Sequence, residues 1–227
     1  MIRPMKTYYL LTKPGIIIGN LITTAGGFAL ASKGHIDPWL FFLLLLGLGP
    51  VIASACIFNN YIDRISDAKM ARTKNRPLAK GSIDPWKAIV FALALGSFGL
   101  IILTLYTNYL AAGVAFAGFF VYVILYSFWK NHSMHATLIG SISGAIPPVV
   151  GYVAASGHLD MGALLLFSIL VLWQMPHFYA IAMFRKEDYA AASIPVLPII
   201  KGTHATKVQM LLYCVAFTFT CALLTLS

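Results

Sequence analysis

The sequence predicts an all-α fold, a polytopic transmembrane helical bundle with seven spans in this chain. The first observation is composition, because 59% of the 227 residues are hydrophobic and only 10% are charged, whereas soluble domains carry about 25% charged residues. The second is that seven apolar stretches reach the roughly 20 residues that a helix needs to cross a bilayer. The mean hydropathy of +0.83 agrees with both. These observations exclude a soluble globular domain.

Each predicted span is an apolar stretch that ends where polar or turn-forming residues begin. The short separators at 33–38, 107–108 and 156–160 contain Gly, Pro, Asn or Asp, which favour turns. Pro147-Pro148 in the fifth span and Pro176 in the sixth remove backbone donors, so we expect kinks there. In chain order the spans are predicted at 14–31, 39–58, 88–106, 109–129, 137–155, 161–184 and 208–226.

The basic residues predict how the spans are oriented. If the connections alternate between the two sides, fifteen of the sixteen Lys and Arg residues lie on one side and Lys33 alone lies on the other. This asymmetry follows the positive-inside rule and places the N-terminus in the cytoplasm. The two longer connections, 59–87 and 185–207, then open on the same cytoplasmic face. Topology and a local basic patch explain the net charge of +9, so no nucleic-acid partner is expected.

The stretch from Asn59 to Asp67 carries the first candidate site. Asn59, Asp63 and Asp67 are spaced at i, i+4 and i+8 where the second apolar span ends. On a helix this spacing stacks the three side chains on one face, each about 6 Å from the next. Hard oxygen ligands in this arrangement suit Mg²⁺, which proteins hold with one or two carboxylates plus substrate phosphates and waters. We predict a catalytic metal site here; the alternative is a solvated helix end with ordinary surface acids.

A run of basic residues follows this motif in the first long connection. Arg72, Lys74, Arg76 and Lys80 supply the positive charge that a phosphate ester needs. We expect at least one of Arg72, Lys74 and Arg76 to contact a diphosphate. The alternative is that the run only anchors the connection on the positive side of the membrane.

Tyr122, Tyr126 and Lys130 repeat the same spacing at the cytoplasmic end of the fourth span. A metal–diphosphate site at the mouth of an apolar bundle suits a lipid diphosphate whose tail lies among the helices. The metal and basic side chains would stabilise charge on the departing diphosphate, and the tyrosine rings could stabilise the allylic cation that remains. An interfacial aromatic belt with a snorkelling lysine explains the three residues equally well.

Polar residues of the sixth and first spans are further candidates. Gln174, His177, Arg185 and Asp188 are predicted to share one helix face, at offsets of 3, 11 and 14. His177 would lie about 10 Å inside the cytoplasmic end, where ionisable groups usually face a cavity or a partner, although a purely structural histidine fits as well. Asp188 is a candidate second metal or substrate carboxylate. Asn20 either lines the cavity or bonds across helices.

Several segments resemble a known family of membrane enzymes. Residues 59–81, NNYIDRISDAKMARTKNRPLAKG, resemble the first aspartate-rich motif of the UbiA-type intramembrane prenyltransferases. Residues 13–28, 138–152 and 173–198 resemble the branch of that family that farnesylates haem, and the WQMPHF…DY…IPVLP pattern in the last segment is specific to that branch. The resemblance runs from about residue 8 to the end of the chain.

The resemblance implies transfer of a farnesyl group from farnesyl diphosphate to the 2-vinyl group of haem b, with addition of water, to give haem o and diphosphate. Haem is then a substrate, and Mg²⁺ is the implied cofactor. Asn59, Asp63 and Asp67 are implied to hold the metal, with residues 72–76 near the diphosphate; His177 near the porphyrin is our own hypothesis. The implied partners are farnesyl diphosphate, haem b and the lipid bilayer of a bacterial inner membrane. Direct passage of haem o to a downstream haem-modifying enzyme or oxidase stays open.

The chain departs from this family's pattern in two ways. The resemblance implies nine spans, so we expect residues 1–227 to form a single transmembrane prenyltransferase domain that lacks its last two helices. Related families also carry a second aspartate-rich motif where this chain has His177, Arg185 and Asp188.

Three rival functions follow from the same residues. The chain could prenylate another aromatic acceptor, such as a quinone precursor, or it could be a non-catalytic haem-binding assembly protein. A transporter fits less well, because transporters bind substrate near the bilayer midplane and the carboxylates here cluster at one surface.

Overall fold

The computed structural model describes residues 2–224, which form a helical bundle with no strand in that range. Seven helical stretches are long and apolar enough to cross a membrane, which confirms the predicted number of spans. They consist of α2 (Pro14–Ser32), α3 (Pro38–Lys69), α4 (Pro85–Tyr106), α5 (Tyr109–Phe120) with η1 (Val121–Tyr126) and α6 (Ser127–Trp129), α7 (Ala136–Gly144) with α8 (Ile146–Ser156), α9 (Met161–Phe184) and α12 (Gly202–Leu224). The shorter helices are α1 (Ile2–Leu11), α10 (Lys186–Ala191) and α11 (Leu197–Ile200).

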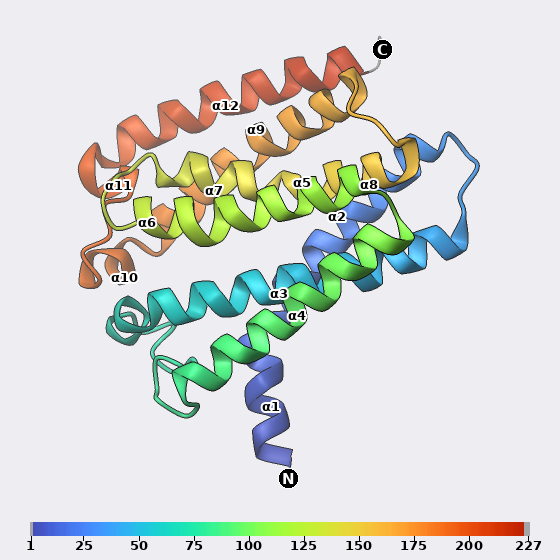
Figure 1. The fold of residues 1–227 in the computed structure, drawn as a ribbon. Helices are drawn as coiled ribbons and strands as arrows, with labels where there is room; N and C mark the ends of the chain where they lie inside the picture. The colour runs from blue at the N-terminus through green and yellow to red at the C-terminus, as the bar shows by residue number, and fades with distance from the viewer. Residues whose placement is uncertain (1, 225–227) are drawn as a thin grey trace.

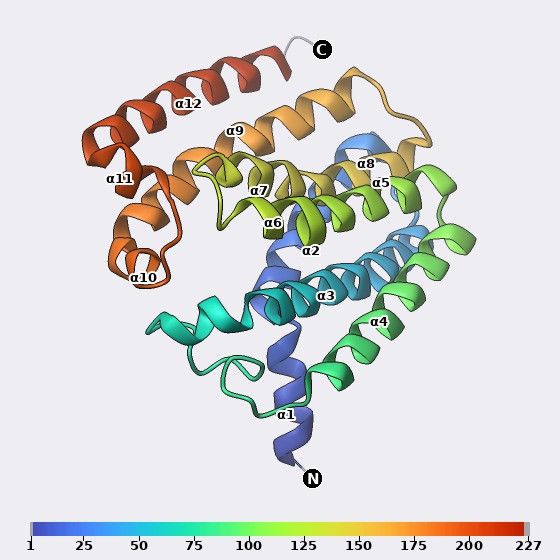
Figure 2. The same cartoon turned by 60° about the vertical axis from the view of Figure 1, so that its left-hand side comes forward.

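The spans lie side by side in a bundle in which their axes are tilted relative to one another, with α2 crossing α3 (Figure 1). The most extensive contacts pair α3 with α4, α2 with α8, and α9 with α12. Figure 2 shows α12 at the edge of the bundle, beyond α9. None of the residues in the most apolar 18-residue stretch of α12 is buried, so this helix presents its apolar side chains to the surroundings of the bundle.

Helix α3 is the element that carries the aspartate motif out of the apolar region. Its 32 residues span about 48 Å at 1.5 Å per residue, more than the roughly 30 Å of a hydrocarbon core. The Asp37 carboxylate caps its start by accepting hydrogen bonds from the backbone N–H groups of Trp39 and Leu40. The helix continues to Lys69, well past the predicted end of the apolar span, so Asn59 and Asp67 lie on one continuous helix.

The fourth and fifth spans are not regular helices. A π-helical turn, η1, interrupts the fourth span, and such turns are frequent at functional sites. The fifth span divides at Ala145, and Pro147 and Pro148 lie in the first turn of α8. The N–H groups of a first turn have no acceptor within the helix, so prolines there cost no helical hydrogen bond. The fifth span is therefore interrupted just before the proline pair, at the place where the sequence predicts a kink. The sixth span stays a single helix, α9, through Pro176.

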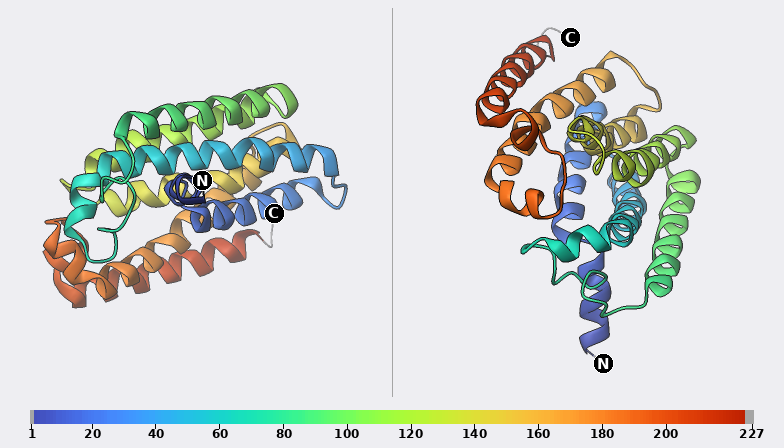
Figure 3. Two further views of the ribbon diagram at one scale, coloured as in Figure 1. Left: turned by 90° about the horizontal axis from the view of Figure 1, so that it is seen from below. Right: turned by 90° about the vertical axis from the view of Figure 1, so that its left-hand side faces the viewer.

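The best-packed part of the bundle lies at the end remote from Asp67. Its buried side chains come from α2, α3, α4, α5, α8 and α9 and include Phe28, Leu44, Leu103 and Val150. At the opposite end, Met70 after α3 packs against Ala192 and Ile194 after α10, and Figure 3 shows these connections meeting there. The two long connections therefore lie at the same end, as the alternation of spans predicts.

Candidate active site

A cavity of about 860 Å³ lies between the packed part of the bundle and the end with the long connections. Its inner wall is apolar and includes Leu48, Val51, Phe119 and Leu170. Its outer part is polar, and most of the predicted site residues meet there although they come from four spans and three connections. Those that line the cavity are Asn20, Asn59, Asp63, Asp67, Arg72, Arg76, Tyr122, Tyr126, Lys130, His177 and Arg185.

The aspartate motif faces this cavity from α3. Asn59, Asp63 and Asp67 are 3%, 3% and 2% exposed, so they are not the solvated helix end that was the alternative. A buried carboxylate without a partner is costly, and each of these residues has one. The partners are three basic side chains from elsewhere in the chain.

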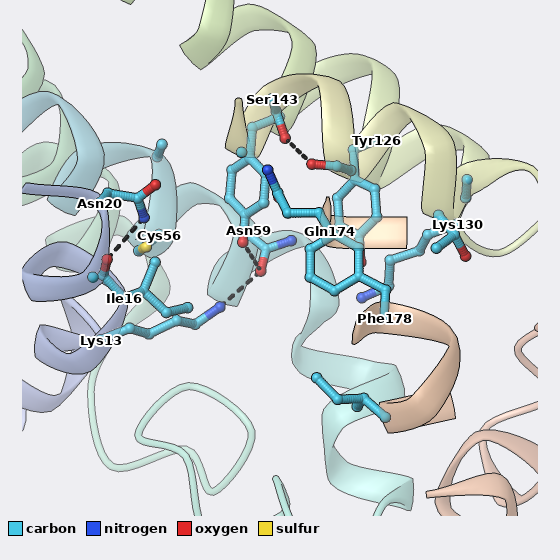
Figure 4. A pocket seen from close by; sticks show the side chains of 18 of the residues that line it. Lys13, Ile16, Asn20, Cys56, Asn59, Tyr126, Lys130, Ser143, Gln174 and Phe178 are labelled. Carbon is cyan, nitrogen blue, oxygen red and sulfur yellow. Dashed lines mark hydrogen bonds between the residues drawn. The ribbon is translucent and has the colours of Figure 1, made fainter. Parts of the chain in front are cut away.

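Lysine and arginine side chains hold all three motif residues. The Lys130 ammonium lies 2.5 Å from Asp63 Oδ2, and Arg76 Nη1 lies 2.7 Å from Asp67 Oδ2. Lys13 Nζ donates to Asn59 Oδ1 at 2.8 Å (Figure 4). The polar end of the cavity is therefore a compact set of alternating donors and acceptors, not a cluster of acids alone.

Lys13 is a site residue that the sequence analysis did not select. It sits between α1 and α2 with φ 53° and ψ 66°, a left-handed conformation that is uncommon for a residue with a side chain and that tends to occur at functional positions. Burial in the cavity lowers the pKa of its ammonium to about 8. The sequence did contain a signal that could have identified Lys13: it lies at the start of the first span, at the same membrane end as Asn59.

Tyr122 and Tyr126 lie against the motif from the π-helical turn. Their rings stack with centroids 5.5 Å apart and planes 7° apart, so they form one aromatic wall of the cavity. The Tyr122 hydroxyl donates to Asn59 Oδ1 at 3.3 Å. The predicted shared face of Tyr122, Tyr126 and Lys130 is present, and it points toward the motif.

Helix α9 supplies the opposite wall. His177 lines the cavity as an exposed side chain, and its ring stacks on Trp173 with centroids 5.4 Å apart. Gln174 is 6% exposed and also lines the cavity, where Figure 4 shows it near Tyr126. Arg185 ends α9 and lies over the ring of Phe184. In α2, the Asn20 amide donates to the carbonyl of Ile16 in its own helix and lines the cavity as well.

Two predicted site residues lie elsewhere. Lys74 is exposed and does not line the cavity. Asp188 does not line it either, because α9 ends at Phe184 and a new helix, α10, begins at Lys186. The expectation that Asp188 shares the α9 face was therefore wrong. Its Oδ1 instead accepts a hydrogen bond from the backbone N–H of Ala71.

The motif fits a magnesium ion that shares its coordination with a substrate. Within residues 2–224 no three Asp, Glu, His or Cys side chains come close enough to hold a metal by themselves. Two carboxylates and one carboxamide do converge, and Asp63 Oδ1 is buried without any hydrogen-bond partner among the described residues. Mg²⁺ is usually bound by one or two carboxylates together with substrate phosphates and waters, so this donor set matches that pattern.

Comparison with known proteins agrees with the resemblance seen in the sequence. The UbiA prenyltransferase family model matches residues 20–227. A protoheme IX farnesyltransferase from Protochlamydia amoebophila is 55% identical over 218 residues, which are 96% of this chain and 77% of that protein. The protoheme IX farnesyltransferase of Klebsiella pneumoniae is 55% identical over 222 residues, covering 97% of this chain and 75% of that protein.

Solved structures share the fold at lower identity. A UbiA homologue from Archaeoglobus fulgidus bound to GPP and Mg²⁺ superposes with a TM-score of 0.78 at 16% identity, covering 97% of this chain and 78% of that one. A digeranylgeranylglyceryl phosphate synthase superposes with a TM-score of 0.77 at 22% identity, covering 95% and 75%. These likenesses confirm the predicted all-α membrane bundle.

Proposed function

The chain belongs to the UbiA prenyltransferase family, and from this premise we propose that it transfers the farnesyl group of farnesyl diphosphate to the 2-vinyl group of haem b. The names of its 55% identical relatives support haem as the acceptor. One observation carries the chemistry: a single cavity joins buried carboxylates and basic side chains to an apolar interior. A lipid diphosphate requires both environments at once.

At the polar end, the residues bind and neutralise the diphosphate. Asn59, Asp63 and Asp67 would hold Mg²⁺, which when bound stabilises negative charge on a leaving diphosphate. Arg72 and Arg76 would donate to the diphosphate oxygens, as charge-assisted hydrogen bonds from guanidinium groups are strong. The Mg²⁺ and GPP in the Archaeoglobus fulgidus homologue support this assignment.

In the apolar part, the residues hold the farnesyl chain and exclude water while the bond changes take place. Breaking the C1–O bond releases diphosphate and leaves an allylic cation, which the stacked rings of Tyr122 and Tyr126 would stabilise. The terminal carbon of the vinyl group then bonds to farnesyl C1. The positive charge moves to the carbon attached to the porphyrin, where water adds and loses a proton.

We assign the haem to the side of the cavity formed by α9. The imidazole of His177 is exposed within the cavity and stacked on Trp173, and no described residue hydrogen-bonds to its ring. The guanidinium of Arg185 lies at the polar end, where it would pair with a porphyrin carboxylate. Lys130 and Tyr126 complete the proposed catalytic set with the aspartate motif.

The orientation in the membrane is part of the same proposal. Seven apolar helices make the chain a multi-pass membrane protein. Because fifteen of its sixteen Lys and Arg residues fall on one side, we place the N-terminus and the mouth of the cavity on the cytoplasmic face of a bacterial inner membrane. The described helices act as a single transmembrane prenyltransferase domain.

The test is to incubate the purified 227-residue protein in nanodiscs with haem b and farnesyl diphosphate, with and without Mg²⁺, and to analyse the haem by mass spectrometry. We expect haem to gain one farnesyl group and one water only with Mg²⁺, together with an equal amount of diphosphate. Gain on an aromatic acid but not on haem would identify a quinone-precursor prenyltransferase. Haem binding without diphosphate release would identify a non-catalytic haem-binding protein.

A further inference from the structure

Each of the three proposed metal ligands contacts one basic side chain in the structure. Lys130 follows α6 and contacts Asp63, while Arg76 lies in the connection after α3 and contacts Asp67. Lys13 precedes α2 and reaches the third ligand, Asn59. Three separate segments thus place one cation each on three consecutive turns of one helix face, which is more than neutralising two buried acids requires.

The formal charges of this group show what it can accept. Two carboxylates and three basic groups leave a net charge of about +1, and a divalent cation entering alone would raise it to about +3 in a site shielded from water, where like charges repel strongly. A diphosphate ester brings about three negative charges, so the cation and the diphosphate together leave the site near neutral.

The contacts also show how an exchange could take place. The Asp63 side chain is 3% exposed and that of Lys130 is 12% exposed, so both lie inside the cavity. Lys130 occupies only Oδ2 of Asp63, and the second oxygen, Oδ1, is buried without a partner among the described residues. Lysine and arginine side chains are long and flexible, so Lys130 and the 27% exposed Arg76 can turn from a carboxylate to a phosphate oxygen without leaving the cavity.

We infer that Lys13, Arg76 and Lys130 are internal counter-cations that occupy the metal-ligand face until a metal–diphosphate pair arrives, and that they then transfer to the diphosphate. The inference rests on the proposed function for the presence of a diphosphate, and it adds an order of binding. The ligand face binds a divalent cation weakly alone and tightly only with diphosphate. The three basic residues thereby bind the diphosphate directly and also compete with the metal for its ligands.

The test measures metal binding, not turnover, with Mn²⁺ as a paramagnetic substitute for Mg²⁺. Free Mn²⁺ is followed by electron paramagnetic resonance in a titration of the full chain in nanodiscs, with and without inorganic pyrophosphate, and the Mn²⁺ that pyrophosphate binds in a protein-free titration is subtracted. We expect wild-type protein to bind Mn²⁺ at least tenfold more tightly with pyrophosphate. Lys130→Met should bind Mn²⁺ alone at least fivefold more tightly than wild type, because the competing ammonium is gone. The same variant should bind the Mn²⁺–pyrophosphate pair at least fivefold more weakly, because a phosphate contact is lost.

Two further variants control for folding and for charge. Lys87→Met removes an ammonium that forms an exposed ion pair with Asp84 and does not line the cavity, so both affinities should match wild type. Lys130→Arg keeps the charge and should restore the wild-type pattern. If Lys130→Met fails to fold, Arg76→Gln, at the more exposed pair, makes the same two predictions.

The outcomes that contradict the inference differ from those that contradict the function. Equal Mn²⁺ affinity of wild-type protein with and without pyrophosphate overturns the inference, as does a Lys130→Met variant in which both affinities fall together. Absence of Mn²⁺ binding under both conditions overturns the metal site in the proposed function. Pyrophosphate carries no acceptor group, so neither result depends on whether haem is the acceptor.

Discussion

The carboxylate of Asp188 accepts a hydrogen bond from the backbone N–H of Ala71 at 3.1 Å, across 117 positions of the sequence. This contact joins the connection after α3 to helix α10. Beside it, Met70 packs against Ala192 and Ile194. The next residue after Ala71 is Arg72, which lines the cavity, so the contact fixes the backbone from which a proposed diphosphate ligand extends.

Asp188→Ala should therefore impair diphosphate binding more than the chemical step. We expect the KM for farnesyl diphosphate to rise about three- to tenfold with kcat changed less than threefold, since a typical hydrogen bond contributes about 0.5–1.5 kcal/mol and this one is exposed. Steady-state assay of diphosphate release measures both constants. Asp188→Asn keeps an acceptor oxygen and should behave like wild type; a kcat loss as large as that of Asp63→Asn would instead make Asp188 a metal ligand.

Asp63→Asn should nearly abolish turnover. The substitution removes one of two carboxylates on the ligand face and leaves the Lys130 ammonium beside a neutral amide in a buried site. We expect release of labelled diphosphate to fall at least about 100-fold, as with other losses of preorganised charge stabilisation. Glu187→Gln, an exposed acid on α10, is the matched control and should retain wild-type turnover. An Asp63→Asn enzyme within tenfold of wild type would remove the metal site from the mechanism.

Two substitutions of Tyr126 in the aromatic wall distinguish the contribution of its ring from that of its hydroxyl. Tyr126→Phe keeps the stack on Tyr122 and should leave kcat within threefold of wild type. Tyr126→Leu removes a π face, and a cation–π contact shielded from water contributes about 2 kcal/mol, so we expect kcat to fall about 10- to 30-fold. Single-turnover measurement of farnesyl transfer distinguishes this from slower product release. Equal rates for the two variants would make the ring a packing group only.

The aspartate motif shows what a sequence of this kind determines. Membrane thickness imposes a length on each apolar stretch, so the seven spans could be located from composition. The spacing of Asn59, Asp63 and Asp67 specifies a face because α3 stays helical to Lys69, and the structure indeed brings the three together at the cavity. The same reasoning failed for Asp188, since helical periodicity says nothing beyond the residue where a helix ends.

The remaining features of the site could not be predicted from the sequence because they depend on tertiary contacts. Lys13 reaches Asn59 across 46 positions, and this contact depends on a left-handed backbone at Lys13 and on how α2 lies beside α3. Neither is encoded in local spacing. Arg76, the partner of Asp67, was predicted as a candidate diphosphate ligand, and Lys130, the partner of Asp63, was predicted as a site residue at the end of the fourth span. That these basic groups pair with the acids themselves could not be seen from the charge pattern alone.

Close packing of α2 on α8 gives the last prediction, which concerns stability. A Cβ added at Gly27 would overlap the backbone carbonyl of Pro148, and one added at Gly151 would overlap the carbonyl of Thr24. Small residues of this kind let membrane helices approach closely. Gly27→Ala must therefore push the helices apart, and overpacking of this kind costs about 1–3 kcal/mol. For a chain of this size we expect the thermal midpoint in detergent to fall by about 2–12 °C.

Gly26→Ala is the matched control for this prediction, one residue away on the same helix. A Cβ at Gly26 meets nothing within 4 Å, and Ala is favoured over Gly in a helix by about 1 kcal/mol, so its midpoint should stay or rise slightly. Size-exclusion fluorescence after heating gives both midpoints in parallel. If Gly27→Ala unfolds within 1 °C of Gly26→Ala, α2 and α8 do not approach as closely as described. The positions of Asn20 and Lys13 relative to α3 would then need revision, because Asn20 lies in α2 and Lys13 immediately precedes it.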